Sequence, residues 1–164
     1  MSDASQYIPG LGRGVTISGS DIGANTVTSS NVDPKFGQYV SVVVTAAQIA
    51  AMSTTPVLLI PTAGTATALI VTDSMLDFSA GTAYTAGGAS NGLSYGGTTT
   101  FLTNTIGTNA FLGTTGTTVY LGAATTYQIP SNTGVYLAGA SPAFATGTGT
   151  VTVSVWYAAI PVTH

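Results

Sequence analysis

The sequence predicts an all-β fold: a β-sandwich, jelly-roll-like, with one short helix and an extended N-terminal arm. The first observation is residues 150–159, where Val151, Val153, Val155 and Tyr157 alternate with residues of the opposite face. The second is a series of short β-branched segments separated by turn residues at sandwich-like spacing. The third is a single helix-start signal, which limits helical structure to one short stretch.

A capping box marks the start of the predicted helix at residues 46–52. The Thr45 hydroxyl faces the Gln48 amide, and the Gln48 side chain reaches back to the Thr45 amide. Val44 and Ile49 flank this cap as a hydrophobic staple. Pro56 ends the helical stretch, because the residue before a proline disfavours the helical conformation.

The other predicted strands are short runs of β-branched, aromatic or aliphatic residues between turn signals. They cover residues 39–44, 57–60, 68–78, 92–96, 99–103, 117–122, 125–130 and 134–138. In the strand at 68–78, strict alternation places Leu76 and Phe78 on one face with the other even-numbered residues. The odd-numbered residues, from Leu69 to Asp77, occupy the other face. Residues 79–91 are rich in Gly, Ala and Thr and are predicted to form a loop or an irregular edge.

Residues 1–35 differ in composition from the predicted sandwich domain at 36–164. One aliphatic side chain recurs every five residues between positions 17 and 32, which matches neither a helix nor a strand face. Residues 7–12 form a compact apolar patch, which is either an extended peptide that docks on a neighbour or a frayed terminus. The candidate partner-binding residues of this arm are Tyr7, Ile8, Leu11, Arg13, Ile17, Ile22, Val27, Val32 and Lys35.

Two interpretations of the arm stay open. In the first, several copies wind together and bury the spaced aliphatic residues along a shared axis, as in a trimer. In the second, residues 1–35 form a flexible tail rich in Ser, Gly and Asn. The first interpretation is favoured because disordered tails rarely keep regularly spaced aliphatic side chains.

Charged residues make up only 4% of the chain, against about 25% in typical globular proteins. There is no Cys, the only His is the terminal His164, and no charged residue follows Asp77. Acid–base catalysis, nucleophilic triads and zinc sites all need side chains that are missing here. We therefore expect no enzymatic activity and no cofactor.

The same composition argues against two classes of partner. A net charge of −3 provides no cationic surface for the phosphates of nucleic acids. No apolar run reaches the roughly 20 residues that span a bilayer, so a membrane partner is not expected either.

Two weaker candidates for binding sites remain. Asp73 and Asp77 fall on the same predicted strand face, where they are a weak candidate for a calcium site that would need further oxygen ligands. The aromatic residues of the domain provide either a platform for stacking sugars or, as favoured here, half-buried packing. They are Tyr84, Tyr95, Tyr120, Tyr127, Tyr136 and Trp156.

Several segments between residues 40 and 157 resemble small virion proteins of tailed bacteriophages. They are residues 42–48, residues 54–61 with Gly64, the strand end Leu76-Asp77-Phe78, residues 83–88, residues 93–96 and the closing Val-x-Val-x-Val-Trp-Tyr. In that group a capped turn, a Thr-Pro-apolar strand and a glycine turn open a β-sandwich. The near absence of charge in the later strands departs from the pattern.

The resemblance implies a capsid decoration, or cement, protein without an active site. Its partners would be the major capsid protein and copies of itself, as a homotrimer, and its location the capsid surface of the virion. An alternative is a trimeric fibre, head-fibre or adhesin domain that recognises a ligand on the host surface. The position in the particle distinguishes the two: many copies over the shell, or a few at a vertex or the tail.

Overall fold

A computed structural model describes residues 37–88, 90–103, 106, 117–121 and 129–163. In these ranges the fold is all-β, with two main antiparallel sheets and one short helix, as predicted from the sequence. The nine candidate residues of the arm lie outside the described residues. Tyr127 and most of the strand predicted at 125–130 lie outside them as well.

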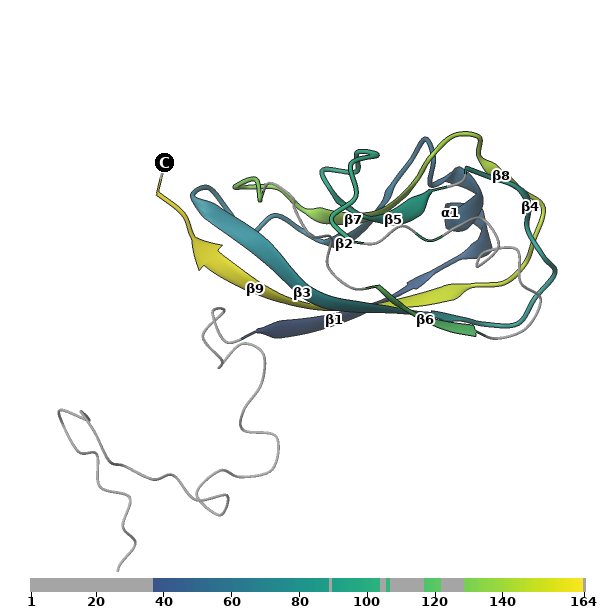
Figure 1. The fold of residues 1–164 in the computed structure, drawn as a ribbon, viewed down its shortest axis with the longest axis horizontal. Coiled ribbons are helices and arrows are strands. Elements are labelled where there is room, and N and C mark those ends of the chain that lie inside the picture. Colours follow the sequence, from purple (N-terminus) through teal and green to yellow (C-terminus); the bar gives the residue numbers. More distant parts are fainter. Residues whose placement is uncertain (1–36, 89, 104–105, 107–116, 122–128, 164) are drawn as a thin grey trace, which may run out of the picture. The chain divides into compact units, whose positions relative to one another are not determined.

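Two sheets form the layers of the sandwich (Figure 1). The four-stranded sheet has the order β1 (Gln38–Val44), β9 (Val151–Pro161), β3 (Thr67–Phe78), β6 (Thr117–Leu121). The three-stranded sheet has the order β2 (Val57–Ile60), β7 (Val135–Gly139), β5 (Asn91–Tyr95). Helix α1 (Ala46–Ala51) lies at one end of the sandwich, beside the short pair β4 (Thr85–Ala86) and β8 (Phe144–Ala145) (Figure 1).

The core lies between the two sheets. The alternation predicted for the last strand is confirmed, because Val151, Val153 and Val155 are completely buried while Trp156 is exposed. The three-stranded sheet contributes Leu59, Val135, Leu137 and Leu93 to the same cluster.

The capping box predicts the helix start correctly. The Gln48 amide donates to the Thr45 hydroxyl at 3.3 Å, and the Thr45 amide donates to Gln48 Oε1 at 2.9 Å. Ile49 and Met52 are completely buried. Six residues of helix therefore form because the cap satisfies the first amides and the apolar side anchors the segment in the core.

The strict alternation predicted for residues 68–78 is wrong. The register between β3 and β9 shifts between Val71 and Asp73, so Thr72 is an extra residue on β3. On both sides of this β-bulge the buried residues face the core: Leu69 and Val71 before it, and Leu76 with its even-numbered neighbours after it. A bulge of one residue reverses the phase of a strand, which is why odd positions point inward first and even positions later.

One further prediction needs correction. Residues 99–103 form no strand; Phe101 instead makes a single bridge to Ser94. The segment at 79–91, predicted as a loop or an irregular edge, is largely irregular and contains the two-residue strand β4, which pairs with β8. Strand β4 forms because β8, which is distant in the sequence, pairs with it, and local patterns do not reveal such a partner.

Candidate functional site

The outer face of the four-stranded sheet is the candidate functional site. Strand register aligns its side chains in three rows that cross neighbouring strands. The first row is Tyr39–Trp156–Asp73, the second is Ser41–Ser154–Met75–Tyr120, and the third is Val43–Thr152–Asp77–Thr118.

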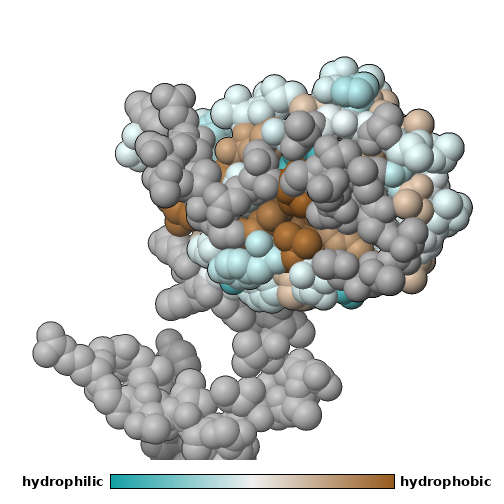
Figure 2. All heavy atoms as spheres, turned by 45° about the vertical axis from the view of Figure 1, so that its right-hand side comes forward, coloured by the Kyte–Doolittle hydropathy of each residue, from teal (hydrophilic) through white to brown (hydrophobic). Residues whose placement is uncertain are grey.

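Large apolar and aromatic side chains are exposed on this outer face. Tyr120 is 67% exposed, Val43 61%, Tyr39 54% and Trp156 38%. Of the five large hydrophobic residues exposed in the described part of the chain, only Leu58 lies on the other sheet. Figure 2 shows one view of the described residues, in which apolar and polar residues both reach the surface. Concentrated exposure of this kind is typical of binding surfaces.

Tyr39 and Trp156 form a ring pair at the start of the first row. Their ring centroids are 5.1 Å apart and their planes are tilted by 49°. The Tyr39 hydroxyl is hydrogen-bonded to the Ser154 hydroxyl at 3.2 Å, and Ser154 donates to Ser41 at 3.5 Å. The hydrogen bonds to Ser154 and then Ser41 lower the pKa of Tyr39. These contacts hold the tyrosine ring in place beside the indole.

Asp73 and Tyr120 form the polar part of the site. The pKa of Tyr120 is raised, first by a hydrogen bond with Asp73 and to a smaller extent by the negative charge of this carboxylate. The Oδ1 atom of Asp73 is buried and lacks a hydrogen-bond partner among the described residues. Because this atom is shielded from solvent, a ligand can reach the carboxylate only through its other oxygen.

The geometry gives no support to a calcium ion shared by Asp73 and Asp77. The two residues do lie on the same outer face, but four positions along a strand correspond to about 13 Å. Calcium ligands lie at about 2.3–2.6 Å from the ion, so both carboxylates cannot readily reach one ion. Asp77 Oδ1 instead accepts a hydrogen bond from the Thr118 hydroxyl at 2.9 Å. The described residues contain no group of three side chains suited to hold a metal ion.

The aromatic residues predicted as a set divide into two groups. Tyr84 and Tyr95 are buried: the Tyr84 hydroxyl donates to the carbonyl of Gly149, and the Tyr95 hydroxyl donates to that of Leu69. Burial raises the pKa of Tyr84. These two are packing residues, as favoured from the sequence, and Tyr136 is partly buried on β7. Tyr120 and Trp156, in contrast, are exposed on the outer face.

Sequence reasoning overlooked Tyr39 as a member of the site. The alternation within residues 39–44 already placed Tyr39 on one face with Ser41 and Val43. Only the pairing of β1 with β9 shows that this face lies beside Trp156.

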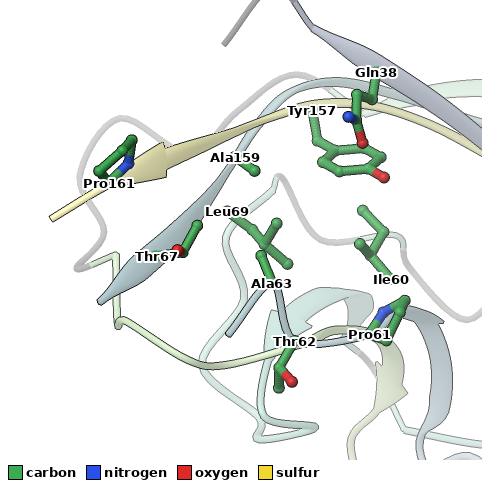
Figure 3. A pocket seen from close by; sticks show the side chains of 10 residues that line it. All are labelled: Gln38, Ile60, Pro61, Thr62, Ala63, Thr67, Leu69, Tyr157, Ala159 and Pro161. Carbon is green, nitrogen blue, oxygen red and sulfur yellow. The ribbon is translucent and has the colours of Figure 1, made fainter. Parts of the chain in front are cut away.

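A cavity of about 500 Å³ opens near the C-terminal end of β9 (Figure 3). Tyr157 and Ala159 line one side of it, and Ile60, Pro61 and Ala63 line the other (Figure 3). Its polar groups are the Gln38 side chain and the hydroxyls of two threonines and Tyr157. Burial raises the pKa of Tyr157, and no Asp, Glu, His, Lys or Arg lines the cavity in the described part of the chain. The residues that line this cavity are therefore suited to contact an apolar group rather than a charged one.

Neither a protein-family profile nor a curated protein matches this chain. Among solved structures, a chain described as "Cyanophage Pam1 capsid asymmetric unit" is similar at 19% sequence identity and a TM-score of 0.45. The alignment covers 74% of this chain and 82% of that chain. A likeness at this level does not establish a shared function. Within the described residues, no helix is long and apolar enough to cross a membrane.

Proposed function

We propose that this protein is a virion structural protein of a tailed phage, which binds the capsid shell as a cement or decoration protein and has no enzymatic activity. The observation that carries the proposal is the charge of the domain. Asp73 and Asp77 are the only charged side chains among the described residues, and no cation balances them. Such a surface opposes contact with neighbours only weakly, which favours association with a protein lattice.

The proposed partners are the major capsid protein and other copies of the same chain in a homotrimer. Residues 1–35 serve as the anchor, because their spaced aliphatic residues suit burial against a partner rather than within one chain. Contacts of this kind rely on apolar burial, so binding to particles depends only weakly on salt. The sequence resemblance to decoration proteins supports the same proposal.

The experiment replaces the four spaced aliphatic residues of the arm by serine in the full chain: Ile17, Ile22, Val27 and Val32. We expect the variant to fold but to lose decoration of particles, and the particles to rupture at a lower temperature. The variant Leu58→Ser, which changes an exposed aliphatic residue on β2, is the matched control. Full occupancy of shells by the arm variant would show that the arm is not the anchor.

A fibre or adhesin domain is the second candidate, favoured by the exposed ring pair and carboxylate of the outer face. A low-resolution map of the intact particle separates the two candidates. Density over the whole shell supports the decoration role, while copies confined to a vertex or the tail support the fibre role.

A further inference from the structure

The first row of the outer face combines two rings and a carboxylate. Tyr39, Trp156 and Asp73 lie on three adjacent strands, so the row spans about 10 Å. The Tyr39 and Trp156 rings meet at 49° and both remain partly exposed. An exposed indole offers a flat apolar surface whose face attracts polarised C–H groups.

The hydrogen-bonding groups lie around these rings. Asp73 is partly buried and borders the indole on one side, and the exposed Tyr120 side chain interacts with the same carboxylate. In the next row the exposed Ser41 offers a hydroxyl, whereas Ser154 is buried and already bonded to Tyr39 and Ser41. Carboxylates accept hydrogen bonds only, so this arrangement suits a ligand rich in hydroxyl donors.

Charge complementarity narrows the class of ligand. The described residues contain two carboxylates and no cation, so a phosphate, sulfate or carboxylate on a ligand would be repelled. A ligand with an apolar face, many hydroxyls and no charge fits both the rings and the carboxylates.

We propose that the row Tyr39–Trp156–Asp73, with Tyr120 beside it, binds neutral carbohydrate. The sugar ring stacks on Trp156, and its hydroxyls donate to the carboxylate oxygen of Asp73 that is not buried. This site is independent of the arm, and the proposal can be tested whether the protein covers the shell or belongs to a fibre. If the protein binds no carbohydrate, the proposed capsid role is unaffected.

Trp156 is the only tryptophan of the chain, so the fluorescence of the intact protein reports directly on this site. The full-length chain is titrated with two neutral glucose hexamers, cellohexaose and maltohexaose, and with an oligogalacturonate of the same length as the charged counterpart. We expect a saturable change of fluorescence with at least one neutral hexamer and an affinity about tenfold lower for the acidic oligomer.

Variants of the outer face locate the binding site. Asp73→Asn should weaken binding about tenfold, as expected for loss of a hydrogen bond to a charged acceptor. Trp156→Ala, followed by saturation-transfer NMR of the ligand, should weaken binding by a similar factor, and Trp156→Phe should restore part of it. Leu58→Ala, an exposed residue of the other sheet, should leave the affinity unchanged.

Three results would overturn the proposal. The first is no saturable response to either neutral hexamer. The second is unchanged binding by Trp156→Ala, which would place the sugar elsewhere. The third is a loss of self-association or of particle binding by Trp156→Ala without any response to sugar, which would show that a protein partner covers this face.

Discussion

The two faces of the four-stranded sheet carry different chemistry on the same strands. The inner face of β9 holds three completely buried valines, and its outer face holds Thr152, Ser154 and Trp156. The inner face thus supplies burial, which stabilises the fold by about 25 cal/mol per Å² of apolar area. The outer face holds exposed aromatic and hydroxyl groups that contribute little to the core, and this difference marks it as the surface available for function.

The largest expected loss of stability comes from a deletion in β3 that changes which side chains point to the inner face and which to the outer face of the sheet. Deleting Ser74 leaves the strand two choices: it keeps the bulge and turns Leu76 and Phe78 outward, or it loses the bulge and turns Asp73 into the core. Exposing the two apolar side chains costs about 1.5–3 kcal/mol each, and burying the carboxylate costs several kcal/mol. We expect loss of cooperative unfolding, measured by circular dichroism in urea.

Deletion of Thr72 is the matched control. Without this bulge residue the strand alternates regularly, and the residues on either side keep their present faces and partners. The deletion removes one hydrogen bond, from the Thr72 hydroxyl to the carbonyl of Trp156 at 3.1 Å, which contributes about 0.5–1.5 kcal/mol. Equal damage by the two deletions would contradict the assignment of the faces.

The next largest effect is the loss of stability on replacing two neighbouring residues of β3 that point to opposite faces of the sheet. Leu76 is completely buried, whereas Met75 is only partly buried and belongs to the outer second row. Leu76→Ala should lower the free energy of unfolding by about 2–5 kcal/mol, because it leaves a cavity in the core. Met75→Ala should lower it by less than about 1 kcal/mol. Urea titrations with equal m-values provide the measurement, and a larger loss for Met75→Ala would reverse the comparison.

The smallest effect concerns the outer face alone. In Asp73→Asn the phenol of Tyr120 loses the negative charge beside it, and its hydrogen bond goes to a neutral amide oxygen, so its pKa should fall toward the ordinary value for tyrosine. Difference absorbance titration against Tyr120→Phe isolates this group among the tyrosines. Asp77→Asn, whose carboxylate is bonded to Thr118, should leave the pKa of Tyr120 unchanged. An unchanged pKa in Asp73→Asn would show that the two side chains do not interact.

Local patterns were sufficient where the chain's own neighbours decide the structure. The helix cap at Thr45, the strand between Pro56 and Pro61, and the alternation of the last strand all follow from residues within a few positions of one another. For the candidate site, composition directed attention to the exposed aromatic residues, among them Trp156 and Tyr120, but it did not separate them from buried ones such as Tyr84.

Contacts between residues that are distant in the sequence were decided only by the tertiary structure. The bulge at Thr72 exists because the pairing with β9 shifts there, and no property of residues 68–78 alone announces it. Tyr39 and Trp156 come from opposite ends of the domain and become neighbours through the pairing of β1 with β9. The sequence by itself determined the all-β class and the near absence of charge, because these depend on composition and on the period of the side chains. The site on the outer face depended on strand order and register, which long-range pairing sets.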